Sequence, residues 1–174
     1  MNSNDRFTVT KGMRIVALLL IIGGALGVGL TIWLDTQLLM SSQLSVLSSA
    51  AAIAGVFICL FGWCVWTGID LWRGRRKALK FAMILFALQI PVITVPQFSY
   101  RMYTGLMLQI RVLSGGQVDT GFQFGSAFGF YISPEVQGLA IGVNLVALFV
   151  LIYLIRVWRE LAQETRAAAA GQGW

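Results

Sequence analysis

Few residues of this 174-residue chain could carry out acid–base or nucleophilic chemistry. It contains no histidine, which removes the commonest general base, the usual haem ligand and most zinc sites. Its acidic residues are scattered, and no spacing pairs two carboxylates for acid–base catalysis. They are Asp5, Asp35, Asp70, Asp119, Glu135, Glu160 and Glu164. No Walker A, GxSxG, HExxH or GxGxxG motif occurs. We therefore expect no enzyme activity, no metal site and no cofactor.

The two cysteines, Cys59 and Cys64, lie in one apolar run. On a helix, five residues of separation leave them about 140° apart around the axis. A disulfide between them is geometrically poor. We interpret both as small apolar helix residues.

The composition indicates a membrane protein. Apolar residues make up 57% of the chain and charged residues 11%, and the mean hydropathy is +0.78. A soluble domain is about a quarter charged. The net charge of +6 is concentrated at the ends of apolar runs, without the aromatic-studded basic stripe of a nucleic-acid-binding protein. We expect no nucleic-acid partner.

Four apolar runs are long enough to cross a bilayer as helices, which takes about 20 residues. They cover approximately residues 15–34, 44–72, 78–98 and 138–158. The first is longer than the apolar core of a signal peptide and is followed by no A-x-A cleavage site, so it is interpreted as a retained span. The sequence predicts one domain, an all-α integral membrane protein built as a four-transmembrane-helix bundle.

Lys and Arg residues predict the orientation of this bundle. Eleven of the thirteen lie before the first run, around the second turn or after the fourth run. The positive-inside rule then places both termini, including the tail 159–174, in the cytoplasm. The short ends and the lack of an organelle address favour a bacterial inner membrane.

The basic cluster between the second and third runs is the strongest charge feature. Arg73, Arg75, Arg76 and Lys77 are expected to attract anionic lipid headgroups on the cytoplasmic side, at about 1 kcal/mol each. Asp70 precedes Arg73 by three residues, a spacing that predicts an ion pair on one helix face.

Small residues four apart predict close helix packing. Gly23 and Gly27 have this spacing in the first run, and Gly138 and Gly142 have it at the start of the fourth. Such faces let helix backbones approach each other in lipid. They are interpreted either as packing inside one bundle or as an association surface between copies.

Two amides are expected at depth in the membrane. Gln89 in the third run and Asn144 in the fourth lie at similar depths, and we predict a hydrogen bond between them. Pro91 is expected to kink or end the third helix. Alternatively, these three residues line a cavity for a ligand, with Phe124 and Phe128 above it.

The outer loop, residues 99–137, contains the stretch SGGQVDTGFQFGSAFGFYISPE. Strict alternation over residues 104–113, turn formers after it and spaced phenylalanines predict a short antiparallel β-hairpin over 104–131. Its apolar face, including Ile110 and Phe122, requires cover from the bundle, lipid headgroups or a partner. In a second interpretation the phenylalanine-rich strand dips into the membrane. Residues 133–135 are predicted to begin the fourth helix.

These observations favour a non-enzymatic membrane protein that acts through protein–protein association, as an accessory, assembly or scaffold subunit. The partner is a membrane protein or a second copy of the chain, with membrane lipids around it. An alternative is binding or transport of a lipid-like or small apolar molecule near Gln89 and Asn144. A third possibility is a lipid-modifying enzyme that uses Asp119 or Glu135.

Overall fold

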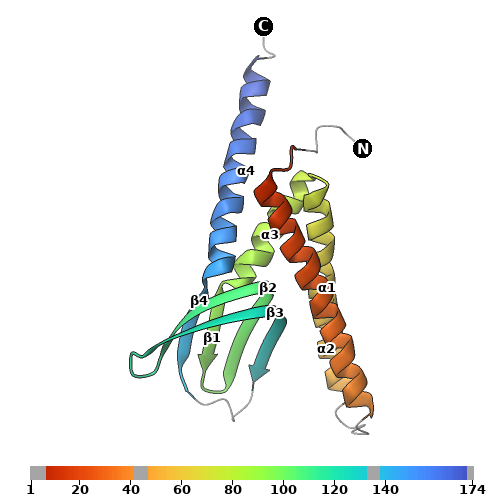
Figure 1. The fold of residues 1–174 in the computed structure, drawn as a ribbon, viewed down its shortest axis with the longest axis vertical. Helices are drawn as coiled ribbons and strands as arrows, with labels where there is room; N and C mark the ends of the chain where they lie inside the picture. The colour runs from red at the N-terminus through yellow and green to blue at the C-terminus, as the bar shows by residue number, and fades with distance from the viewer. Residues whose placement is uncertain (1–6, 41–46, 133–137, 172–174) are drawn as a thin grey trace.

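The structure, a computed structural model, describes residues 7–40, 47–132 and 138–171. Within these residues, four helices accompany a four-stranded antiparallel sheet (Figure 1). In chain order the elements are α1 (Lys11–Met40), α2 (Leu47–Trp72), α3 (Arg76–Gln89), β1 (Pro91–Val95), β2 (Phe98–Leu113), β3 (Val118–Ile132), β4 (Ala140–Asn144) and α4 (Leu145–Gly171). The predicted all-α four-span bundle is therefore wrong.

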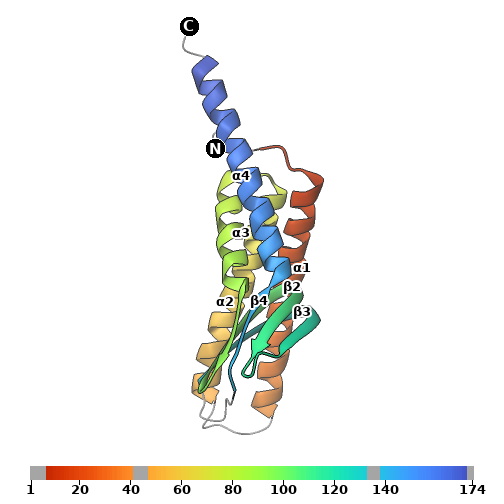
Figure 2. The ribbon, with the colours of Figure 1, turned by 90° about the vertical axis from the view of Figure 1, so that its left-hand side faces the viewer.

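Two of the described helices are long and apolar enough to cross a membrane. The qualifying segments are Lys11–Leu34 of α1 and Ala54–Trp72 of α2. The two helices run antiparallel and lie side by side in both ribbon views (Figures 1 and 2). Figure 2 also shows α4 extending past the ends of the other helices.

The third apolar run is only partly helical. Helix α3 has 14 residues, which is about 21 Å of helix and short of a hydrocarbon core of about 30 Å. Pro91 has no N–H to continue the helix, and the sequence PVITV is rich in β-branched side chains that favour a strand. The run therefore changes from helix to strand at residues 89–91.

The fourth apolar run begins as a strand instead of a helix. Residues 140–144 form β4, in which Ala140, Gly142 and Asn144 are buried while Ile141 and Val143 are exposed. This period-2 pattern is that of a half-buried strand. Helix α4 starts only at Leu145.

The strands β1, β2 and β4 close into a small ring. Strand β1 pairs with the start of β2 and with β4, and β4 pairs with the far half of β2. Register partners share a face, so residues of alternating position point into the ring. Val92, Tyr103 and Met107 form a buried cluster there, with Ala127 packed against it.

The predicted hairpin is confirmed and is longer than expected. Strand β2 pairs with β3 from Phe98 opposite Ile132 to Val112 opposite Val118. At its middle, Gly105 lies opposite Gly125, with φ of +83° and +129°. Such φ values favour glycine. Here the hairpin turns away from the helices, and its outer half projects from the body of the molecule (Figure 1).

The main core lies between the helices and the helix-facing side of β2. Its buried residues are Met13, Val16, Ala17, Leu20, Cys64, Leu71, Ala78, Leu79, Ala82, Leu85, Phe86, Met102, Ala147, Leu154 and Val157. Gly23 permits close contact between α1 and β2, because an added Cβ would lie 2.5 Å from the backbone nitrogen of Gly105. The helix start predicted at 133–135 lies outside the described residues.

Candidate functional site

Gln89 lies at the junction between α3 and the sheet. It ends α3 and is 1% exposed. Its Oε1 accepts hydrogen bonds from the backbone N–H and the hydroxyl of Thr104, at 3.0 and 3.1 Å. The side-chain Nε2 has no hydrogen-bond partner among the described residues. Gln89 therefore links the end of a helix to the middle of β2.

Asn144, which is 0% exposed, links β4 to α4. Its Oδ1 accepts from the backbone N–H groups of Val146 and Ala147, at 3.2 and 3.4 Å, as an N-cap does. Its own N–H donates to the carbonyl of Ile90 at 2.8 Å. The predicted bond between Asn144 and Gln89 is wrong, because each side-chain oxygen is used elsewhere and both NH₂ groups lack a partner among the described residues.

A third buried amide lies opposite Asn144 in the sheet. Gln109 lies on β2, where its register partners are Asn144 of β4 and Gly121 of β3. It is 3% exposed, and its Oε1 has no partner in the described part of the chain. A Cβ at Gly121 would lie 2.8 Å from its Nε2, so the glycine makes room for the side chain. Gln109 was not among the site residues predicted from the sequence, although its alternation with Leu108 and Ile110 placed it on the opposite side of the strand.

The five residues predicted to bind a ligand are not brought into one site. Gln89 and Asn144 are buried, and Pro91 begins β1. Phe128 packs against other rings, 4.8 Å from Phe57 and 5.9 Å from Tyr100 between centroids. In contrast, the side chain of Phe124 is 70% exposed.

Tyr100 fixes this aromatic contact to the end of α3. Its hydroxyl donates to the carbonyl of Leu88 at 2.7 Å.

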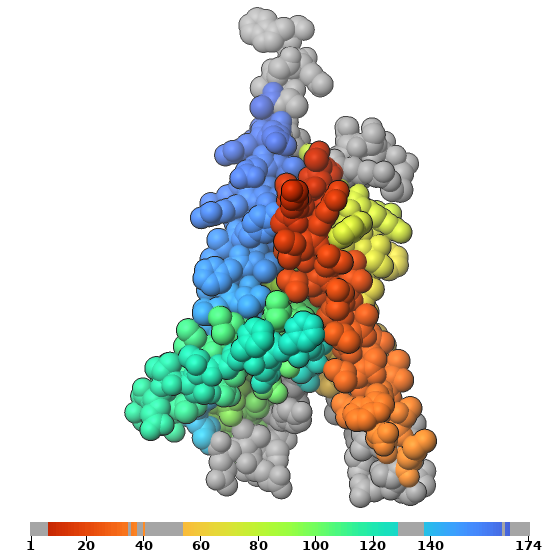
Figure 3. Space-filling model, in the orientation of Figure 1, coloured from red at the N-terminus to blue at the C-terminus, as the bar shows by residue number. Residues whose placement is uncertain are grey.

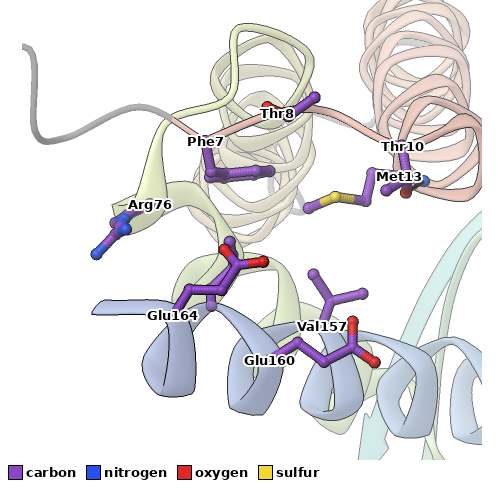
Figure 4. A pocket seen from close by; sticks show the side chains of 9 residues that line it. Phe7, Thr8, Thr10, Met13, Arg76, Val157, Glu160 and Glu164 are labelled. Carbon is purple, nitrogen blue, oxygen red and sulfur yellow. Dashed lines mark hydrogen bonds between the residues drawn. The ribbon is translucent and has the colours of Figure 1, made fainter. Parts of the chain in front are cut away.

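A polar pocket of about 410 Å³ lies at the end of the molecule where α1 begins (Figure 4). It is formed by the segment before α1, the start of α3 and one side of α4, and is lined by Phe7, Thr8, Thr10, Met13, Arg76, Val157, Glu160, Leu161 and Glu164. The Thr10 hydroxyl is 2.8 Å from that of Tyr153 on α4, and the N–H of Phe7 donates to Gly74 at 2.9 Å. The pocket is lined by two carboxylates together with apolar and hydroxyl side chains, and none of these lining residues forms a nucleophile–base pair.

The glycines predicted to associate lie in different surroundings. A Cβ added to Gly23 would lie 2.5 Å from the backbone nitrogen of Gly105. On Gly27 it would lie 2.5 Å from the Phe61 ring, and on Gly142 it would lie 2.5 Å from the carbonyl oxygen of Ile110. These glycines therefore serve contacts within the chain. At Gly138 a Cβ would meet nothing within 4 Å.

Basic and tryptophan side chains gather at the end of the molecule where α1 begins and α2 ends. The Arg14 guanidinium lies 5.7 Å from the ring centroid of Trp72, and the Lys80 ammonium lies 5.1 Å from that of Trp158. The cations and rings attract each other. We call this the basic end.

Of the predicted lipid-binding cluster at the basic end, Arg73 and Lys77 are exposed. Asp70 does not pair with Arg73 as predicted. Both of its carboxylate oxygens instead accept from Nη1 of Arg75, at 2.9 and 3.0 Å. Arg76 is half-buried and lines the pocket of Figure 4.

The far half of the hairpin and β4 share an exposed apolar surface, which we call the outer face. Register partners such as Leu108 and Phe122, or Ile110 and Val143, place their side chains on the same side of the sheet. The outer face consists of Leu108, Ile110, Val112, Val118, Phe122, Phe124, Ile141 and Val143, all between 37% and 70% exposed. In Figure 3 the hairpin that carries most of these residues is the green-to-teal part of the surface at the lower left.

An ion pair lies near the tip of the hairpin. Arg111 and Asp119 are register partners, and the Arg111 Nε donates to the carboxylate at 3.1 Å while Nη2 makes a second contact. Both side chains are about one-third exposed. Since Asp119 is paired in this way and not with another carboxylate, the geometry offers no acid–base pair at this position.

The sequence predicted the hairpin part of the outer face, including Ile110 and Phe122, but not the part on β4. The signal was present, because Ile141 and Val143 alternate with small or polar residues. Because Ile141 and Val143 lie in a long apolar run, this run was interpreted as a helix and the alternation was not recognised as a strand pattern. Comparison with protein-family models, with curated proteins and with solved structures found no match for the chain.

Proposed function

We propose that this chain is a non-enzymatic integral membrane protein that binds another polypeptide through the outer face of its sheet. Its role is that of an accessory or assembly subunit. The observation that carries the proposal is the outer face itself, eight large apolar side chains on one side of three paired strands.

Placement in a membrane is supported by the two long apolar helices and by their surroundings. Leu18, Ile22 and Leu26 of α1 are 41% to 50% exposed, which suits acyl chains. The pairs of cations and tryptophans at the basic end suit an interface with lipid headgroups. In the proposed orientation the basic end faces the cytoplasm, as in a bacterial inner membrane, and the sheet lies toward the opposite side.

Association is supported by the size of the outer face. Phe122 and Phe124 are 67% and 70% exposed. With about 200 Å² for a whole phenylalanine side chain, the two present roughly 270 Å². A stable interface buries about 800 Å² on each partner, so two residues supply about a third of it. Apolar patches of this kind mark interaction surfaces.

The experiment replaces Ile110 and Phe124 together with aspartate. Both side chains are exposed in the chain itself, so we expect insertion and folding to remain, while burial of two carboxylates makes association unfavourable. The protein is extracted with its lipids into nanodiscs, and co-purifying polypeptides are measured by native mass spectrometry. We expect at least a tenfold loss of the associated species.

The matched control is Gln117→Asp, which adds a charge at the exposed hairpin turn and away from the outer face. It should associate as the wild type does. If the double variant associates normally, or if the wild-type chain is only ever found as a single polypeptide with lipid, the proposed function is wrong.

A further inference from the structure

We infer that the ring of β1, β2 and β4 binds a water molecule between the side chains of Gln109 and Asn144. The water accepts a hydrogen bond from Nδ2 of Asn144 and donates one to Oε1 of Gln109. This site lies inside the ring, on the side of the sheet opposite the outer face, and does not depend on the proposed association with another polypeptide.

The two amides face each other across neighbouring strands. Gln109 of β2 and Asn144 of β4 are register partners, so their side chains lie on the same side of the sheet. Two residues before Gln109 on this side is Met107, a member of the buried cluster inside the ring. Gln109 is 3% exposed and Asn144 is 0% exposed, so neither amide reaches bulk solvent.

The oxygen of Asn144 fixes the orientation of its amide. Oδ1 accepts from the backbone N–H groups of Val146 and Ala147, and an NH₂ group could not take its place. Nδ2 is therefore a donor, and it has no acceptor among the described residues. Across the ladder, Oε1 of Gln109 is an acceptor to which no described residue donates. A buried donor and a buried acceptor thus lie on register partners without bonding each other.

The two side chains lean away from each other. Nε2 of Gln109 lies 2.8 Å from the position that a Cβ on Gly121 would take, so the glutamine crosses toward β3. Asn144 instead turns toward the first turn of α4, whose N–H groups it caps. Register partners start about 4.5–5.5 Å apart at Cβ. Two hydrogen bonds of about 2.8 Å that meet at one water oxygen span roughly 4.5 Å, which matches this separation.

The ladder on this edge of β2 ends at the same place. Strand β1 pairs with residues 98–101 and β4 with residues 109–113, and residues 102–108 have no register partner on this edge among the described strands. Gln89 uses part of this edge, where its Oε1 accepts from the N–H of Thr104. Buried waters make about three hydrogen bonds. Backbone groups next to Gln109 that no strand uses supply the third.

Water is the ligand that suits both atoms, because it donates and accepts. A cation would not bind the NH₂ group of Asn144, and an anion would not bind the carbonyl oxygen of Gln109. The nearby charges of Arg111 and Asp119 are paired with each other. Buried polar groups in folded proteins are nearly always hydrogen-bonded, to protein or to ordered water.

Solid-state NMR of the full chain in lipid bilayers tests the site. With ¹⁵N-labelled asparagine, magnetisation from water should reach the side-chain NH₂ of Asn144 although it is buried, and loss of the signal in Asn144→Ser assigns it. Gln109→Leu should abolish this transfer. Gln123→Leu is the matched control, because it makes the same change on the same side of the hairpin at a half-buried position opposite Met107, and it should leave the transfer unchanged.

The stability of Gln109→Leu is the second measurement, by reversible unfolding in lipid bicelles. Loss of the bridge leaves Nδ2 of Asn144 without an acceptor, so the folding equilibrium constant should fall about tenfold. If Oε1 of Gln109 had no partner, the apolar side chain of similar size would instead leave the protein equally or more stable, and that result would overturn the inference. A wild-type Asn144 NH₂ that receives no magnetisation from water overturns it as well, and so does transfer that persists in Gln109→Leu.

Discussion

The contact between Gly23 and the sheet can be tested by adding one methyl group. Gly23→Ala would place a Cβ 2.5 Å from the backbone nitrogen of Gly105 and 2.7 Å from the carbonyl carbon of Thr104. Both are backbone atoms, which cannot rotate away as a side chain does. Helix α1 or strand β2 must therefore shift, and we expect the variant to be less stable than a glycine-to-alanine change elsewhere in α1.

The magnitude follows from a comparison within the same helix. Replacing a helix-interior glycine by alanine favours the helix by about 0.5–1 kcal/mol. That gain is common to Gly23 and to Gly29, where a Cβ would meet nothing within 4 Å. Forcing a methyl group into a filled contact costs about 1–3 kcal/mol. Gly23→Ala should therefore be about 1–3 kcal/mol less stable than Gly29→Ala.

The assay is reversible unfolding in lipid bicelles titrated with sodium dodecyl sulfate, with the folded fraction measured by pulse proteolysis. Gly29→Ala is the matched control, with the same chemical change in the same helix. Gly105→Ala probes the contact from the other side, and it also forces a non-glycine residue to φ +83°. Because Gly23 and Gly105 share one contact, the double variant should lose less stability than the sum of the two.

Equal stability of Gly23→Ala and Gly29→Ala would refute this reasoning. It would mean that α1 does not pack against β2 through its small-residue face. A large loss of dimer without any loss of monomer stability in Gly23→Ala would instead assign that face to association between copies.

Two further changes test the buried amides. Gln89→Leu should destabilise the fold by about 1–3 kcal/mol in the same unfolding assay, because the buried N–H and hydroxyl of Thr104 lose their acceptor; a stability equal to wild type would contradict the observed contact. Asn144→Ala should cost about 1 kcal/mol through loss of the N-cap of α4, whereas Asn144→Ser retains a neutral capping oxygen at this buried position and should recover most of it; equal losses for the two variants would show that capping is not what the side chain contributes.

Local sequence patterns were sufficient to predict the hairpin and the two long helices, α1 and α2. The alternation at 104–113 is a period-2 signal that lies between the long apolar runs and competes with no helical pattern there. In α1 an unbroken apolar stretch without proline predicts a helix by length alone. The candidate residues Ile110 and Phe122 were found for the same reason, since their exposure follows from the alternation.

The third and fourth runs were misread because hydropathy does not distinguish an apolar strand from part of a membrane helix. The sequences PVITV and AIGVN are apolar enough to extend the neighbouring helices in any averaged window. Their strand conformation depends on pairing with β2, whose residues are distant in sequence. The predicted hydrogen bond between Gln89 and Asn144 was wrong for a related reason. It assumed that both residues lie inside membrane helices at similar depths, whereas α3 ends at Gln89 and α4 begins after Asn144.

The sequence by itself determined the apolar class of the chain, the basic end, the two long helices and the hairpin, because each of these is a property of residues close together along the chain. Only the tertiary structure decided that β1, β2 and β4 close into a ring and that Gln89 serves Thr104. It also decided that the outer face continues onto β4 and that one edge of β3 is left free. These features depend on which backbone hydrogen bonds form between distant segments, and sequence patterns within a single segment do not specify that pairing.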